Sequence, residues 1–256
     1  MVYPSAPSTA IAALAPLLAT PQRIAITTHF NPDGDAMGSS LGLAHVLKAM
    51  GHAVQVVLPN PSPGNLRWMP GYQEAIDHGT AKEASEKALA DADLLFCLDY
   101  NRADRVHELE PFVRQFPLKV LIDHHRGPED IFNVVFSDIT ASSTCQMVYD
   151  VVMALGKGEF IDLDTATCLY SGIMTDSGSF RFPSTTPHTL RVAADLRERG
   201  AMPHLIHGAI MEDNTIDRLR LTGFALSERL QVLEGGEATL IALSKADLER
   251  FNYVPG

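Results

Sequence analysis

The sequence predicts an α/β fold with a mostly parallel sheet and helices on both of its faces. Two observations predict it. Short apolar runs alternate with longer helical segments over the first two-thirds of the chain, and polar loops follow several of those runs directly. Such alternation is typical of parallel sheets, because consecutive parallel strands need a crossover connection.

Strands are expected where short apolar runs lie between turn-forming residues, at residues 23–28, 53–58, 93–98, 118–122 and 133–136. Helices are expected where apolar residues recur with helical spacing, at residues 35–50, 81–90, 102–116, 142–155, 162–175 and 187–199. Residues 11–19 are expected to form an N-terminal helix. They do not resemble a targeting signal, because no Lys or Arg precedes Arg23 and Pro16 interrupts the run.

The remaining residues predict a smaller second region. The expected boundaries are a catalytic domain over 1–200, a connector with one helix over 201–213, and the start of a C-terminal domain over 214–256. Residues 219–233 are amphipathic, and residues 238–243 form a lone strand. Since a single strand cannot make a stable sheet, this last domain is expected to be incomplete.

Composition limits the classes of partner. The chain has 31 acidic and 20 basic residues, a formal net charge of −11, which repels long polyanions and favours small substrates over long nucleic acid. No apolar run approaches the ~18 residues of a membrane helix. The three cysteines are widely spaced and odd in number, which fits free thiols in a reducing cytoplasm.

Acidic and imidazole side chains follow three of the predicted strands directly. Because the carboxyl ends of parallel strands meet at one edge of a sheet, these side chains are expected to converge there. A further carboxylate, Asp176, ends an apolar run and has small neighbours. The strand-following residues are His29, Asp33, Asp35, Asp99, Asp123, His124 and His125.

Five aspartates at one edge would repel one another and raise one another's pKa unless cations lay between them. Carboxylates mixed with imidazoles suit Mn²⁺, with Co²⁺, Mg²⁺ or Zn²⁺ as alternatives. The ligands are too many for one ion, whereas a pair of ions ~3.5–4 Å apart uses them all and suits phosphoryl hydrolysis.

Each feature alone has a plainer interpretation. Residues 31–34, Asn-Pro-Asp-Gly, are a strong turn signal, and Asp99 could cap a helix. Adjacent histidines are often solvated. The metal site is predicted because the features fall together at one end of one sheet.

At these residues the sequence resembles the DHH phosphoesterase family. The match comprises His-x-x-x-Asp-x-Asp at 29–35, the isolated Asp99, the Asp-His-His motif at 123–125, and Thr-Asp-Ser-Gly-Ser-Phe-Arg at 175–181. Ser-Ser-Thr at 142–144 further resembles the branch of bifunctional oligoribonuclease/pAp phosphatases. The resemblance implies a metal-dependent hydrolase for short oligoribonucleotides and 3′-phosphoadenosine 5′-phosphate (pAp).

The resemblance also implies roles for individual residues. One metal would be held by His29, Asp33 and Asp99, and the second by Asp35, Asp99, His124 and Asp176, with Asp99 as the bridge. Asp123 would orient a ligand imidazole, and His125 would face the substrate phosphate. Arg105 is the preferred residue to neutralise charge on the phosphoryl oxygens, with Arg102 and Arg181 as alternatives.

The chain departs from the family pattern in its last residues, where no Gly-Gly-His-type loop occurs. We therefore expect an incomplete, DHHA1-like substrate-binding domain. Two alternatives stay open for function: a phosphodiesterase for linear or cyclic dinucleotides, and a metal-binding module that is inactive without a complete C-terminal domain. An inorganic pyrophosphatase fits the motifs less well, and a homodimer is left open.

Overall fold

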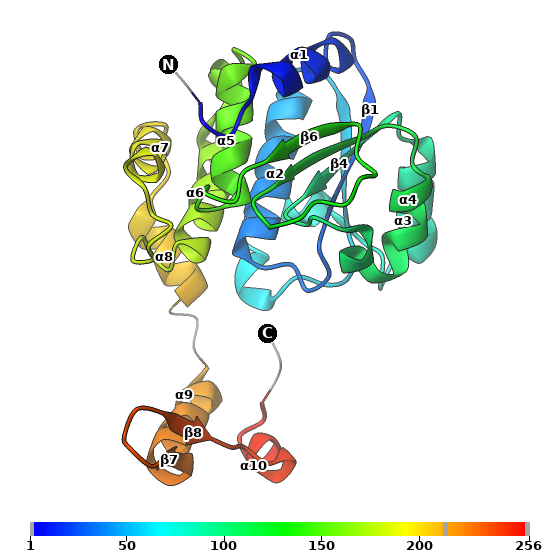
Figure 1. Ribbon diagram of the computed structural model, residues 1–256. Helices are drawn as coiled ribbons and strands as arrows, with labels where there is room; N and C mark the ends of the chain where they lie inside the picture. Colours follow the sequence, from blue (N-terminus) through cyan, green and yellow to red (C-terminus); the bar gives the residue numbers. More distant parts are fainter. Residues whose placement is uncertain (1–2, 212–214, 254–256) are drawn as a thin grey trace. The chain divides into compact units, whose positions relative to one another are not determined.

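The protein divides into two compact units, residues Met1–His207 and Gly208–Gly256 (Figure 1). The structure, a computed structural model, describes residues 3–211 and 215–253. The division falls within helix α8 (Pro203–Met211), in the segment predicted as a connector. Residues 212–213 of that connector lie outside the described residues.

The larger unit contains a six-stranded sheet in which every pair of neighbours is parallel, in the order β3-β2-β1-β4-β5-β6. All five predicted strands are present, and the two-residue β3 was not predicted. The strands are β1 (Arg23–Thr28), β2 (Ala53–Leu58), β3 (Ile76–Asp77), β4 (Leu94–Leu98), β5 (Lys119–Asp123) and β6 (Val134–Ser137). The predicted fold class is confirmed.

Helices cover both faces of this sheet (Figure 1). On one face, α3 (Lys82–Asp91) and α4 (Glu110–Gln115) pack on apolar side chains such as Leu95 and Leu121. On the other face, α2 (Gly34–Ala49) and α5 (Thr144–Ala154) pack on the sheet. Helix α6 (Leu163–Asp176) packs on α2 and α5, α7 (Pro187–Glu198) packs on α6, and α1 (Ser8–Leu17) lies against β6. No helix of the described residues is long and apolar enough to cross a membrane.

Helices α2 and α6 approach each other closely because glycines line the contact. Gly34, Gly38 and Gly42 recur every four residues, so they lie on one face of α2. A Cβ at Gly38 would lie 2.5 Å from the carbonyl oxygen of Cys168, and one at Gly172 would lie 2.9 Å from Asp35 Oδ1. Only hydrogen fits at these places. The approach brings the start of α2 beside the end of α6.

The helix predicted over residues 102–116 is not continuous. A 3₁₀ segment over Ala103–Leu109 precedes α4, and His107 within this segment has a non-helical backbone with φ 49° and ψ −115°. Val106, Leu109 and Val113 are all buried, so apolar side chains of this segment face the core. The prediction of one uninterrupted helix was wrong, because spacing alone does not reveal a break in the hydrogen-bonded chain.

The smaller unit holds α9 (Ile216–Phe224), a π-helical turn (Ala225–Arg229), β7 (Leu230–Val232), β8 (Thr239–Ile241) and α10 (Lys245–Arg250). One prediction is corrected here. The strand expected to be alone pairs in antiparallel register with β7, which lies at the end of the amphipathic segment 219–233. The turn at Gly235 and Gly236, both with positive φ, permits this hairpin.

Candidate metal centre

The strand order reverses between β1 and β4, and ligands of open α/β sheets bind at the carboxyl ends of the strands beside such a reversal. The loop after β1 carries His29 and Asp33, and Asp99 follows β4 directly. Neighbouring β5 ends in Asp123 and leads into the two histidines. The first turn of α2 adds Asp35, and the last residue of α6 adds Asp176.

Three groups of three side chains have ligand atoms within 4.8 Å of one another: His29, Asp33 and Asp99; Asp35, His124 and Asp176; and Asp99, His124 and His125. In the first, His29 Nε2 lies 3.4 Å from Asp99 Oδ2 and 3.8 Å from Asp33 Oδ1. The His29 Nδ1 hydrogen bonds to the carbonyl oxygen of Phe30 at 2.8 Å. Since a carbonyl can only accept, Nδ1 carries a proton, and Nε2 is the nitrogen that faces the two carboxylates and would bind a metal after losing its own proton.

The second group is built around His124. Its Nε2 lies 3.5 Å from Asp176 Oδ2, 3.6 Å from Asp99 Oδ1 and 3.9 Å from Asp35 Oδ2. Asp99 therefore points one oxygen toward each histidine, which is the geometry that a bridging carboxylate requires. The structure brings all six predicted ligands into these first two groups, and the third group adds His125 beside Asp99 and His124.

The backbone at Asp99 is unusual, with φ 63°. This left-handed conformation is uncommon for residues other than glycine, asparagine and aspartate. It turns the chain sharply at the end of β4 and places the carboxylate over the sheet edge. The Thr144 hydroxyl then donates to Asp99 Oδ1 at 2.9 Å and holds it there.

The N-terminus of α5 fixes Asp35. Its Oδ2 accepts from the Thr144 backbone N–H at 2.6 Å, and its Oδ1 accepts from the Cys145 N–H at 2.9 Å. Free N–H groups at a helix start favour a carboxylate. Ser143 caps this helix, because its side chain accepts from the Gln146 N–H. The contacts of Thr144 with two predicted ligands were missed, although Ser-Ser-Thr before a helix was the available signal.

The donor set fits divalent cations. Among the described residues, no Lys or Arg forms an ion pair with Asp35, Asp99 or Asp176, although the first two are almost fully buried. Burial raises the pKa of Asp35 well above its usual value, and the nearby Asp99 and Asp176 raise it further. Burial, with the charges of Asp99 and Asp33, raises the pKa of Asp176 to about 6. Cations among these oxygens would remove that electrostatic cost.

Asp123 is fully buried and binds the side chain of His125. Its Oδ1 lies 2.6 Å from His125 Nδ1, and its Oδ2 accepts from the His125 backbone N–H at 3.0 Å. The hydrogen bond to Asp123 raises the pKa of His125 and leaves Nε2 directed elsewhere. The imidazole that Asp123 orients is thus the one assigned to substrate phosphate, and not the predicted ligand His124.

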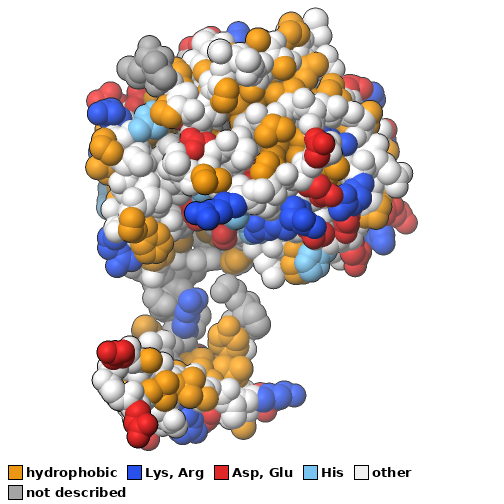
Figure 2. All heavy atoms as spheres, in the orientation of Figure 1, with side chains coloured by type: hydrophobic (Ala, Val, Ile, Leu, Met, Phe, Trp, Pro, Cys, Tyr) orange, Lys and Arg blue, Asp and Glu red, His pale blue; other side chains and the backbone are white. Residues whose placement is uncertain are grey.

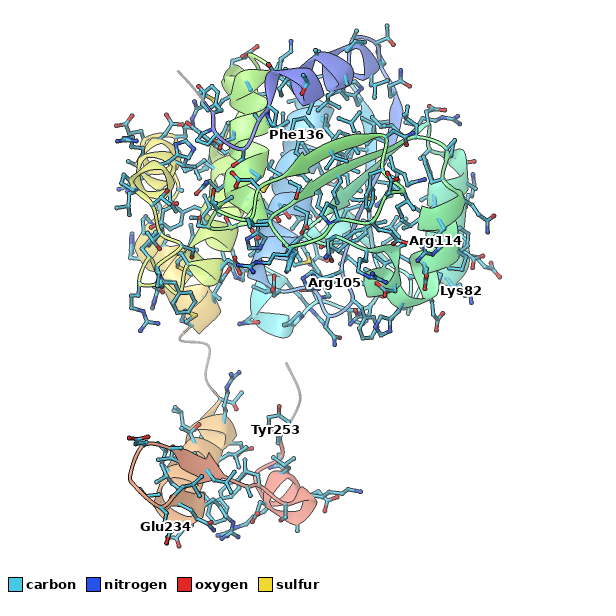
Figure 3. All side chains as sticks on the ribbon, viewed as in Figure 1. Lys82, Arg105, Arg114, Phe136, Glu234 and Tyr253 are labelled. Atoms are coloured by element: carbon cyan, nitrogen blue, oxygen red, sulfur yellow. The ribbon has the colours of Figure 1, made fainter. Side chains whose placement is uncertain are left out.

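The three candidate arginines differ in their partners. Arg102 pairs with Asp104 at 3.2 Å, and Arg181 Nε donates to the Gly178 carbonyl at 2.7 Å. Arg105 forms no side-chain ion pair within residues 3–211 and 215–253, and its charge is close enough to oppose the protonation of His125. Figure 3 shows Arg105 apart from Lys82 and Arg114, which lie toward the α3 and α4 side of the unit. Of the three arginines, Arg105 is therefore favoured as the residue that contacts the substrate phosphate.

Comparison with known proteins places the geometry in a family. The model of the DHH family, N-terminal domain, matches residues 23–173. A Thermus thermophilus "Bifunctional oligoribonuclease and PAP phosphatase NrnA" is 38% identical over 175 residues, 68% of this chain and 49% of that protein. A Bacillus subtilis "Cyclic-di-AMP phosphodiesterase GdpP" is 28% identical over 82% of this chain and 33% of its own length.

A solved structure is also similar. The crystal structure of an exopolyphosphatase-related protein from Bacteroides fragilis has a TM-score of 0.95 and 33% identity, and covers 98% of this chain and 74% of that one. The chain spans about half the length of the Thermus relative, at 49%. The family match over residues 23–173 includes five of the six predicted ligands, which the structure brings together at the sheet edge.

Proposed function

The chain belongs to the DHH family, and we propose that it is a two-metal-dependent phosphoesterase that hydrolyses short oligoribonucleotides and pAp. One observation carries this proposal: six predicted carboxylate and imidazole ligands from separate loops and helices meet at the edge of β1, β4 and β5. The 38% identity to a protein described as an oligoribonuclease and PAP phosphatase supports the substrate class.

In this proposal His29, Asp33 and Asp99 hold one cation, and Asp35, Asp99, His124 and Asp176 hold the second. Mn²⁺ is the proposed metal, because mixed carboxylate and imidazole sites suit it, and Mg²⁺ or Co²⁺ are alternatives. When bound, such cations supply Lewis acidity toward a phosphoryl oxygen and lower the pKa of water.

The chain's own residues then bind and orient the phosphate. His125 donates from Nε2 to a phosphoryl oxygen, and Asp123 holds the ring by its Nδ1 and favours the protonated form. The Arg105 guanidinium stabilises charge that develops on the same phosphoryl group. Thr144 keeps Asp99 in place through its hydroxyl.

Charge supports a small substrate. The net charge of −11 disfavours long polyanions, whereas Lys and Arg side chains gather in a band on one face of the larger unit (Figure 2). A cyclic or linear dinucleotide phosphodiesterase is the second candidate, favoured by the 28% identity to the cyclic-di-AMP phosphodiesterase. The three cysteines are free and buried, which supports a reducing cytoplasm as the proposed location.

The test is a substrate comparison with Mn²⁺-loaded protein. We expect nucleotide release from a diribonucleotide and phosphate release from pAp, both abolished by chelation. Faster cleavage of cyclic di-AMP would favour the second candidate, and release of phosphate from pyrophosphate alone would overturn both. Stoichiometric metal with no hydrolysis of any substrate would identify a metal-binding module.

A further inference from the structure

Phe30 and His107 form a stacked pair of rings beside the metal centre. Their ring centroids lie 3.9 Å apart and their planes differ by 11°. We propose that this pair is a stacking platform for a nucleobase next to the scissile phosphate. The inference rests on the proposed function, because it specifies how that site would recognise a nucleotide.

The position of the pair fits a nucleotide. Phe30 directly follows the predicted ligand His29, and its backbone N–H donates to the carbonyl oxygen of Arg105 at 2.8 Å. His107 lies two residues beyond Arg105 on the same 3₁₀ helix. The pair therefore lies next to both the metal ligands and the arginine assigned to phosphate. A base that is joined through its ribose to that phosphate would therefore lie beside the rings of Phe30 and His107.

One face of the pair is open to solvent. His107 is exposed and Phe30 is half-buried, so Phe30 covers one side of the imidazole and leaves the other free. Within residues 3–211 and 215–253, the His107 side chain makes no hydrogen bond or ion pair. An exposed flat ring with this geometry is suited to stacking, which accepts any base because every base has a π-face.

The strained backbone conformation at His107 indicates that its imidazole ring has a role in ligand binding. Its φ of 49° with ψ of −115° is a conformation that glycine adopts far more readily than histidine. Strain at such a residue persists only where the surroundings enforce it, and it is concentrated at ligand sites. If folding were the only requirement, glycine would serve better at this position.

The platform is held rigidly before any ligand arrives. In the loop after β1, the Asn31 N–H donates to Asn60 Oδ1 at 2.6 Å, and Asn60 Nδ2 donates to Asn31 Oδ1 at 3.0 Å. These bonds fix the residue that follows Phe30, and the Arg105 carbonyl fixes Phe30 itself. A preorganised ring pair loses little further conformational freedom when a base binds.

Two variants of the full chain test the platform: His107→Gly, which removes the ring and relieves the backbone, and Phe30→Leu, which removes its support. The probe is 2-aminopurine riboside 5′-monophosphate, whose fluorescence is quenched on stacking, titrated into Mn²⁺-loaded protein. We expect quenching with the parent and roughly tenfold weaker binding for each variant. The control is His204→Ala, which removes another exposed histidine ring and should bind the probe like the parent. Alanine is used there instead of glycine because His204 lies in a helix.

A baseless ligand separates stacking from damage to the centre. Ribose 5-phosphate should compete equally well in the parent and in His107→Gly, and thermal unfolding of His107→Gly should occur at the same or a higher temperature. No quenching in the parent, unchanged probe affinity in His107→Gly, or an equal loss of ribose 5-phosphate binding would each overturn the platform.

The two proposals fail in different ways. A parent that cleaves no diribonucleotide but loses probe affinity on His107→Gly contradicts the proposed function and supports the platform. A parent that cleaves the dinucleotide with the same KM as His107→Gly supports the function and contradicts the platform.

Discussion

The two units of the chain use their strands in opposite ways. In the larger unit every residue of β4 and β5 is buried, and the polar side chains begin only at the strand ends. In the smaller unit every residue of β7 and β8 is exposed, and Val232 and Ile216 are 65% and 68% exposed. Figure 2 shows the apolar side chains on that surface.

The difference shows what a metal centre needs from its scaffold. Aspartates that repel one another keep fixed positions only when buried strands and close-packed helices hold their backbones. The larger unit provides this, because Asp35 and Asp99 are anchored by hydrogen bonds from α5. The two-stranded ribbon of the smaller unit buries too little to hold such a cluster. All six predicted ligands accordingly lie in the larger unit.

The largest expected effect tests whether the centre depends on its shared carboxylate. Asp99→Ala should remove most bound metal and lower activity at least about 100-fold, because even partners of ligands typically cost 10- to 100-fold. Elemental analysis of purified protein and initial rates on a diribonucleotide measure this. Asp104→Ala, which removes an exposed carboxylate of the nearby 3₁₀ helix, should retain both. Full metal content in Asp99→Ala would contradict the bridging role.

Glycines should respond in opposite directions in the two units. Gly172→Ala would place a methyl group against the Cys145 sulfur and should lower the free energy of unfolding by about 3 kcal/mol. Gly223→Ala in α9 meets no atom within 4 Å and should raise local helix stability by about 0.5–1 kcal/mol. Urea unfolding measures the first, and hydrogen exchange of α9 measures the second. Equal effects would contradict the difference in packing.

Arg105 should matter for turnover but not for metal. Arg105→Ala should lower kcat for a diribonucleotide by about 10- to 100-fold, because a charge partner of the phosphoryl oxygens is lost. Its metal content should match that of the parent. Arg102→Ala is the control, since Arg102 is paired with Asp104 and should lose little. The reverse order of effects would reassign the phosphate contact to Arg102.

Metal binding should weaken in acid. Without cations the pKa of His29 is raised to about 10, because its burial is outweighed by its hydrogen bonds to Asp33 and Asp99, and the pKa of Asp176 is raised to about 6. A cation must displace the His29 proton already at neutral pH and the Asp176 proton as well below pH 6, so apparent Mn²⁺ affinity should fall more steeply below pH 6 than above it. The raised pKa of Asp176 also means that the folded chain keeps a proton which the unfolded chain releases near pH 4. Stability of the metal-free protein therefore declines as pH rises from about 4 to 6.

Calorimetric titration with Mn²⁺ and thermal unfolding of chelated protein measure the two trends. Asp176→Asn carries no titrating carboxyl group, so the stability of this metal-free variant should decline less as the pH rises from about 4 to 6. An affinity that stays constant from pH 7 to pH 5 would show that Asp176 is not a ligand.

Much of the site followed from local sequence. Short apolar runs ended by Asp or His located β1, β4 and β5 and the side chains at their ends, because strand period and turn chemistry are local properties. The same reasoning did not detect the bond between Asp123 and His125 or the hold of Thr144 on Asp99. These contacts depend on side-chain directions set by packing between distant segments.

The sequence by itself determined the fold class, the strand positions and the identity of the acidic and imidazole residues, since periodicity and residue type are properties of neighbours in the chain. The tertiary structure decided the strand order, the break at His107, the pairing of β7 with β8 and the grouping of the predicted ligands. All four features depend on contacts between segments far apart in the chain, so local sequence patterns do not predict them.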